Sequence, residues 1–162
     1  MSKFDELAVL AAKYSRTIFE NRRQCQRAAE LVMRGYAEFL GCPLENVDFI
    51  QLDGNLNATA STVKFGEPVP MVLDGNACWY FCGRIRFKGP DPIARAHELF
   101  KLGLKYHDGL LTIHEDQDFQ ADPADAATLL PFFEHLYEAS RAGFGSPLVK
   151  QSKRIGFALW PE

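Results

Sequence analysis

The sequence predicts an α+β fold: an antiparallel sheet of about five to six strands, a long or hairpinned N-terminal helix, and two further helices packed on the sheet. Three observations support this prediction. Apolar residues recur at helical spacing over residues 4–40, and short apolar runs separated by Asp-Gly pairs fill residues 46–88. Two later segments open with an Asp-Pro helix start. Runs of hairpins with separately added helices are typical of α+β domains.

The composition predicts a single domain. The chain has 162 residues, of which 47% are hydrophobic and 24% charged, as in ordinary globular proteins. We expect one α+β domain over residues 1–162, with a helical segment at 1–42 and the sheet with its helices at 46–162. The N-terminus lacks a signal-peptide pattern, and no apolar run approaches the ~18–20 residues of a membrane span. These features predict a cytoplasmic protein with no membrane partner, whose four cysteines are thiols.

The N-terminal helix carries a seven-residue repeat, with Ser2 and Asp5 placed as a capping box. An unbroken helix of ~37 residues would be about 55 Å long, whereas a compact domain of this size is roughly 39 Å across. Either residues 20–24 break it into a helical hairpin, or its overhang packs on a partner or a second copy. The hairpin is preferred, because Leu and Ile are few at the repeat positions. The predicted partner interface comprises Leu7, Ala11, Tyr14, Ile18, Cys25 and Val32.

Two hairpins are predicted between residues 46 and 88. The tetrapeptide Leu-Asp-Gly-Asn occurs at 52–55 and again at 73–76, each time between two short apolar runs. Asp-Gly favours the primed turns that join antiparallel strands. We therefore pair 47–52 with 56–65 and 69–73 with 77–88, and attribute the repeated tetrapeptide to turn chemistry.

The remaining elements follow from helix starts and alternation. Asp91-Pro92 predicts a helix to about Tyr106, and residues 110–119 predict a strand. A helix from Asp122 to about Ala142 should kink or divide at Pro131. The alternation of Ile155, Phe157 and Leu159 predicts a final strand.

The strand over 77–88 offers the best candidate for a binding site. Trp79, Phe81, Ile85 and Phe87 should face the core. The opposite face places an aromatic residue beside alternating cations, which could meet phosphates or stack a base. The alternative is a solvated sheet face whose cations discourage edge pairing. The candidate ligand-binding residues are Tyr80, Cys82, Arg84, Arg86 and Lys88.

No catalytic or metal signature is present, so we predict no cofactor and no metal. Cys78 and Cys82 would lie ~13 Å apart on a strand, too far to chelate one ion. The segment His114-Glu115-Asp116, with Asp118 after it, could hold a divalent cation through its carboxylate oxygens, but is better explained as a solvated strand end. Cys82 activated by His114 would require neighbouring strands and has no supporting motif.

The predicted order of elements resembles that of the small dimeric chaperones that escort type III secretion effectors. Residues 39–44 before the first strand, and a closing helix with Leu130, Phe133 and Leu136, suit that pattern. The resemblance covers topology over about residues 36–142 and no specific motif. The helical extension before it and the terminal strand depart from the pattern. It implies an adaptor that binds another protein.

Three functional hypotheses follow from these patterns. The preferred one is a binding or regulatory protein without catalytic activity, acting through a protein partner or as a homodimer. The alternative is a small enzyme or ligand-binding domain with a small-molecule pocket on the face of Tyr80, Cys82 and Arg84, with His114 nearby. Nucleic-acid binding by the basic row is the weakest, because the net charge is −3.

Overall fold

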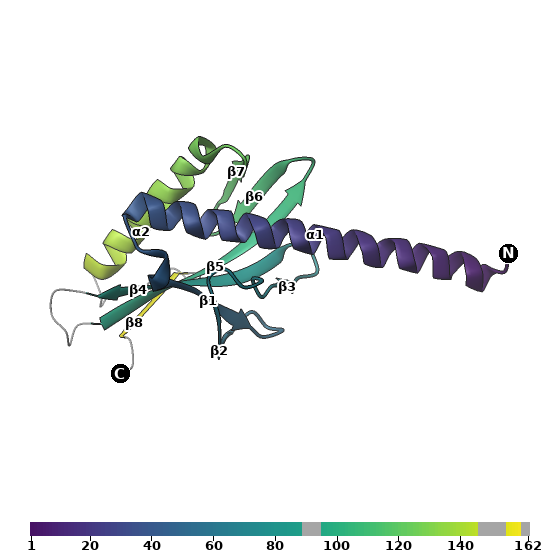
Figure 1. Cartoon of the computed structure of the whole chain (residues 1–162), viewed down its shortest axis with the longest axis horizontal. Coiled ribbons are helices and arrows are strands. Elements are labelled where there is room, and N and C mark those ends of the chain that lie inside the picture. Colours follow the sequence, from purple (N-terminus) through teal and green to yellow (C-terminus); the bar gives the residue numbers. More distant parts are fainter. Residues whose placement is uncertain (89–94, 146–154, 160–162) are drawn as a thin grey trace.

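Two helices lie over one face of an antiparallel sheet in the computed structural model, which describes residues 1–88, 95–145 and 155–159 (Figure 1). Helix α1 (Lys3–Leu40) crosses the sheet and extends beyond it, and helix α2 (Leu130–Gly145) lies beside the C-terminal part of α1. Two short 3₁₀ helices, η1 (Leu44–Asn46) and η2 (Ala126–Leu129), complete the helical elements of the described residues. The strands are β1 (Val47–Leu52), β2 (Ala58–Lys64), β3 (Val72–Leu73), β4 (Trp79–Lys88), β5 (Arg95–His107), β6 (Leu110–His114), β7 (Asp118–Ala121) and β8 (Ile155–Leu159).

The sheet is organised around the long strand β5. Its main order is β2-β1-β4-β5-β6-β7, with β3 paired to β4 and β8 paired to β5. One edge of β5 pairs with the whole of β4. Its other edge is shared, since β8 pairs with residues 96–100 and β6 with residues 103–107. The α+β class with an antiparallel sheet is therefore confirmed.

The core lies between the helices and the facing side of the sheet. Trp79, Phe81 and Ile85 are buried there as predicted, and Phe87 packs against them at the margin. From the helices, Tyr36 and Phe133 meet with ring centroids 5.8 Å apart. We call the opposite side, which carries Tyr80, Cys82 and Arg84, the outer face of the sheet.

The preferred hairpin of the N-terminal helix is wrong, because α1 is continuous. Polar Asn21, one of the supposed weak points, fastens the helix to the sheet: its side chain donates to the carbonyl of Tyr106 and accepts from the Trp79 indole, both at 3.0 Å. Gly35, the other weak point, lets α2 approach closely, since a Cβ there would lie 2.8 Å from the Phe133 ring. Both breaks in the apolar repeat are thus packing contacts.

The helix predicted over 91–106 is also wrong where it can be compared, because residues 95–107 form β5. Good helix formers such as Leu, Lys and Glu fill this segment, but its apolar residues follow a period of two. Phe100, Leu102 and Leu104 are buried, whereas the alternating Lys101 and Lys105 lie on the outer face. Pairing along the full length of β4 overrides intrinsic helix propensity. This strand also breaks the element order on which the resemblance to the secretion chaperones depends.

The last third of the chain contains more and shorter secondary-structure elements than predicted. The single strand expected over 110–119 is a hairpin of β6 and β7. Asp122 begins a turn, Asp125 caps η2, and α2 starts only at Leu130, with Pro131 in its first turn. The final strand is confirmed as β8. The described residues thus hold two α-helices instead of three, and more strands than the five to six expected.

Both predicted hairpins are confirmed, but the turn type is wrong. In each loop the aspartate side chain accepts two backbone N–H groups: Asp53 accepts from Asn55 and Asn57, and Asp74 from Asn76 and Cys78. The left-handed residue is Leu56 or Ala77, not the glycine that a primed turn would use. The two loops share this side-chain-supported geometry, which explains the repeated tetrapeptide.

Candidate functional site

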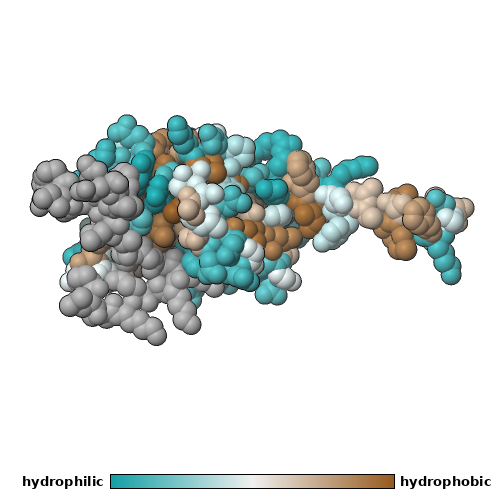
Figure 2. Space-filling model, turned by 90° about the horizontal axis from the view of Figure 1, so that it is seen from below, coloured by the Kyte–Doolittle hydropathy of each residue, from teal (hydrophilic) through white to brown (hydrophobic). Residues whose placement is uncertain are grey.

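The N-terminal part of α1 projects from the domain and is exposed throughout residues 3–17 (Figure 1). We call residues 3–17 the arm. Its large apolar side chains remain in solvent: Phe4 is 79% exposed, Leu7 65% and Tyr14 67%. Figure 2 shows hydrophobic residues gathered along the projecting helix. Monomeric soluble proteins rarely leave a contiguous apolar surface of this kind uncovered.

One stripe of exposed apolar residues on the arm lies on the same face of α1 that is buried further along the helix. Phe4, Leu7, Ala11, Tyr14 and Ile18 follow spacings of three or four residues, so they form one stripe on the helix. The stripe continues, beyond the contact at Asn21, into residues that are buried against the sheet: Cys25, Ala28, Ala29, Val32, Met33, Tyr36 and Ala37. The same face is therefore covered over the domain and uncovered along the arm.

The predicted partner interface divides at the base of the arm. Leu7, Ala11 and Tyr14 are exposed, and half-buried Ile18 packs at the margin of the core. Cys25 and Val32 are completely buried within their own domain. The arm also carries exposed Leu10 and Phe4, which the sequence-based set did not include.

The predicted basic row on the outer face is engaged within the protein. Arg84 donates to both carboxylate oxygens of Asp48, at 2.7 and 2.5 Å, and this contact is largely buried. The hydrogen bonds to Asp48 raise the pKa of Arg84 further. Arg86 donates to the carbonyl oxygen of Glu45, whereas Lys88 is exposed. The row lies on the outer face as expected, and ligand binding by it stays a prediction.

Cys82 lies apart from His114 and is not activated. It is completely buried in a small cluster with Ile50 and Leu52, beneath the loop that contains Leu56. Burial raises the pKa of Cys82 to about 12, although nearby Lys101 and Arg84 act in the opposite direction. At neutral pH this residue is therefore a thiol and a poor nucleophile.

Tyr80 and His114 instead line a cleft on the outer face, which we call the Gly103 cleft. Cross-strand pairing places Gly103 between Tyr80 on β4 and His114 on β6. The Tyr80 ring lies across the glycine, since a Cβ on Gly103 would be 2.9 Å from it. The cleft, of about 290 Å³, is lined by Asp74, Asn76, Cys78, Tyr80, Lys105 and His114.

Asp118 orients the histidine of the Gly103 cleft. The carboxylate of Asp118, the cross-strand neighbour on β7, contacts Nδ1 of His114. Nε2 of His114 is buried and makes no hydrogen bond. A carboxylate at one ring nitrogen fixes the orientation of the imidazole and leaves the other nitrogen for a ligand. The sequence placed His114 and Asp118 near each other, but the gap at Gly103 depends on strand order.

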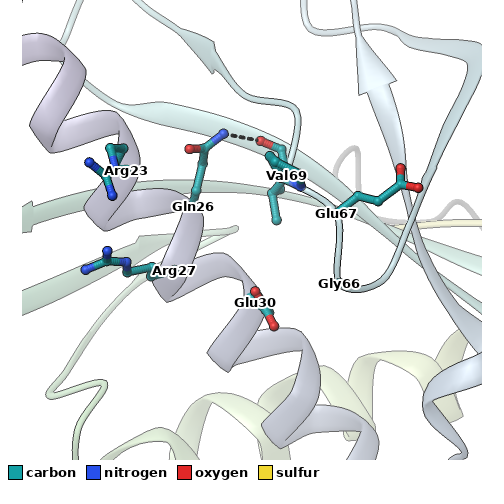
Figure 3. Close-up of a pocket in the computed structure, with 8 residues that line it drawn as sticks. Arg23, Gln26, Arg27, Glu30, Gly66, Glu67 and Val69 are labelled. Atoms are coloured by element: carbon teal, nitrogen blue, oxygen red, sulfur yellow. Dashed lines mark hydrogen bonds between the residues drawn. The ribbon is translucent and has the colours of Figure 1, made fainter.

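Another cleft lies between α1 and the loop after β2 (Figure 3). Gln26 donates to the carbonyl oxygen of Val69 at 2.9 Å and joins the two walls. Arg23 and Arg27 extend from α1 away from the loop, and Glu30 and Glu67 add opposite charge nearby. The charged groups do not converge on one point, so this cleft presents no organised anion site.

An apolar cleft of about 730 Å³ lies between the C-terminal part of α1, α2 and the ends of β4 and β5. Ser140, one of its lining residues, lies 2.7 Å from Oε1 of Glu98, which is completely buried. Burial raises the pKa of Glu98 to about 8. The Glu98 carboxyl is therefore largely protonated at neutral pH.

No group of three or more His, Cys, Asp or Glu side chains within the described residues is placed to hold a metal ion. Neither α1 nor α2, the α-helices of the described residues, combines the length and apolar composition that crossing a membrane requires. No protein-family model matches the chain, and no curated protein or solved structure is significantly similar to it. The candidate sites therefore depend on geometry and chemistry.

Proposed function

We propose that this protein is a binding protein that associates with a protein surface through the apolar face of its arm. The observation that supports the proposal is the uncovered stripe of Phe4, Leu7, Ala11 and Tyr14, with exposed Leu10 beside it, on a helix whose same face is buried over the domain. Isolated helices of about 12–15 residues are marginal in water, and helices in proteins are stabilised mainly by packing of an apolar face. A protein surface that covers the stripe would supply that packing.

The test is a charge placed on the stripe. Leu7→Glu should weaken association at least tenfold, because burying one leucine side chain contributes about 1.5–3 kcal/mol and tenfold corresponds to about 1.4 kcal/mol. Light scattering and sedimentation equilibrium on the purified chain measure self-association. Titration with any protein that co-purifies measures binding to another chain. Leu7 is exposed, so the melting temperature should stay within a few degrees of wild type.

Lys13→Glu is the matched control. Lys13 is exposed on the same arm but lies outside the apolar stripe, so this charge change should leave association within about threefold of wild type. Equal association of wild type, Leu7→Glu and Lys13→Glu would refute the proposal. So would a wild-type chain that is monomeric and binds no other protein.

A second candidate function is binding of a small polar molecule in the Gly103 cleft. The specific observation is the buried, unpaired Nε2 of His114 in a cleft that also presents Lys105 and Asp74. A few convergent polar groups in a concave site are typical of ligand pockets. The cation and the carboxylate suit a zwitterion such as an amino acid.

When single amino acids are added at millimolar concentration, at least one of them should raise the melting temperature of the wild-type protein. Lys105→Ala, a substitution on an outer strand face, should abolish that rise while preserving the fold. Lys88→Ala, an exposed lysine on the same face, is the matched control and should retain it. An identical rise in all three proteins, or none in wild type, would exclude this candidate.

A further inference from the structure

The arm is complementary to itself when two copies run antiparallel. We propose that the occupant of its apolar face is the arm of a second copy, with a two-fold axis at Ala11. This inference rests on the proposed function and names its partner. In such a pair, residue n lies level with residue 22−n of the other chain, because the axis passes through residue 11.

Side-chain size is the first argument for this arrangement. Leu7 lies level with Ser15 of the other copy, Ala8 with Tyr14, and Ala11 with itself. Each large residue in the centre of the stripe thus meets a small one, as close packing of two helices requires. A parallel pair would instead set Leu7 against Leu7 and Tyr14 against Tyr14, so that each large residue meets another large one.

The length of the exposed helix is the second argument. Antiparallel pairing about Ala11 brings the first helical residue, Lys3, level with Phe19 of the other copy. The domain begins at that point, because Ile18 packs at the core margin and Asn21 is fastened to Trp79 and Tyr106. The arm of each copy, residues 3–17, therefore lies level with residues 5–19 of the other copy and ends where the partner's domain starts.

Charge is the third argument. The first turn of α1 carries Asp5 and Glu6, whereas Lys13 and Arg16 lie further along the arm. Antiparallel pairing brings the acidic first turn of each arm alongside the part of the other arm that carries Lys13 and Arg16, so ends of opposite charge lie near each other outside the stripe, and it also opposes the two helix dipoles. Parallel pairing would bring like charges together at both positions.

A size exchange tests the register. Tyr14→Ala should raise the dimer dissociation constant at least tenfold, because it removes the large member of two symmetric contacts. Adding Ala8→Tyr restores the large residue from the opposite side, so the double variant A8Y/Y14A should return to within threefold of wild type. Sedimentation equilibrium measures all three. A double variant weaker than Tyr14→Ala would overturn the antiparallel register.

Cross-linking gives a second readout. In a Cys42→Ser background, which removes the one native cysteine that is not fully buried, Ala11→Cys should form a covalent dimer on mild oxidation. Val9→Cys, an exposed position outside the stripe, should not. Equal cross-linking at both positions would overturn the inference.

The inference and the proposed function can fail separately. A monomeric wild-type chain that binds another protein, with binding abolished by Leu7→Glu, would overturn the second-copy inference and support the proposed function. A monomeric chain whose binding is insensitive to Leu7→Glu would overturn both.

Discussion

Replacing Glu98 with glutamine should stabilise the protein against unfolding at high pH. Burial raises the pKa of Glu98 to about 8, from an ordinary value of 4.5 in the unfolded chain. Between these values the folded state holds a proton that the unfolded state releases, so the stability of wild type falls as pH rises. Over that window the loss is on the order of 5 kcal/mol. Glutamine does not titrate, so this part of the pH dependence should disappear.

The contacts around Glu98 agree with a protonated carboxyl. Ser140 Oγ lies 2.7 Å from Glu98 and 2.8 Å from the carbonyl oxygen of Leu136, but one hydroxyl has a single proton to donate. Both contacts are satisfied when the carboxylic acid donates to Ser140 and Ser140 donates to Leu136. The amide of glutamine can make the same donation.

Urea unfolding of wild type and Glu98→Gln from pH 4.5 to pH 9 measures this effect. The free energies of unfolding should diverge with increasing pH and become parallel above pH 8. Glu138→Gln changes an exposed carboxylate on α2 and serves as the control, whose profile should follow wild type. Parallel profiles for wild type and Glu98→Gln would show that Glu98 is ionised in the folded protein.

Asp48→Ala should be the most destabilising single change on the outer face. The substitution leaves the guanidinium of Arg84 largely buried without its two hydrogen bonds to the carboxylate. Removing one partner of a buried ion pair typically costs about 3–5 kcal/mol. Chemical denaturation at pH 7 should show this loss as a lower midpoint with an unchanged slope.

The companion variant replaces both partners with apolar residues. Asp48→Val/Arg84→Leu removes the buried charges together, and such exchanges are often neutral or stabilising. Because residues 48 and 84 are cross-strand neighbours, the two side chains can pack on each other. The double variant should therefore recover most of the stability lost in Asp48→Ala. A single variant within 1 kcal/mol of wild type would mean that Arg84 reaches solvent or another acceptor.

Local chemistry made part of the fold predictable. The two hairpins followed from Asp53 and Asp74, whose side chains support the loops without any distant contact. Strand β5 was missed because Asp91-Pro92 was interpreted as a helix start, and good helix formers such as Leu99 and Lys101 do not contradict that interpretation; pairing with β4 decides the conformation of this segment. Helix α1 was predicted to break around Asn21, because a polar residue interrupts the apolar repeat there. The two residues that bind its side chain, Trp79 and Tyr106, are distant in sequence, so the local pattern does not indicate these contacts.

The candidate sites were predictable to a similar extent. The seven-residue repeat identified the apolar face of α1, but periodicity alone does not tell which half the domain covers, so Val32 and Leu7 were grouped together. The alternation on β4 placed Tyr80 and Arg84 on one face correctly. Their different surroundings, Asp48 for one and the Gly103 cleft for the other, arise from strand order, which the sequence pattern does not encode.

Helix α1 has a mechanical property that follows from its composition. No proline or glycine occurs before Gly35, so nothing in the first 34 residues favours a kink. The 38 residues of α1 span about 57 Å at 1.5 Å per residue, and Asn21 clamps this rod to the sheet. A partner bound to the arm is therefore held at a fixed distance and angle from the outer face of the sheet, because the continuous helix α1 sets the spacing between the arm and the sheet.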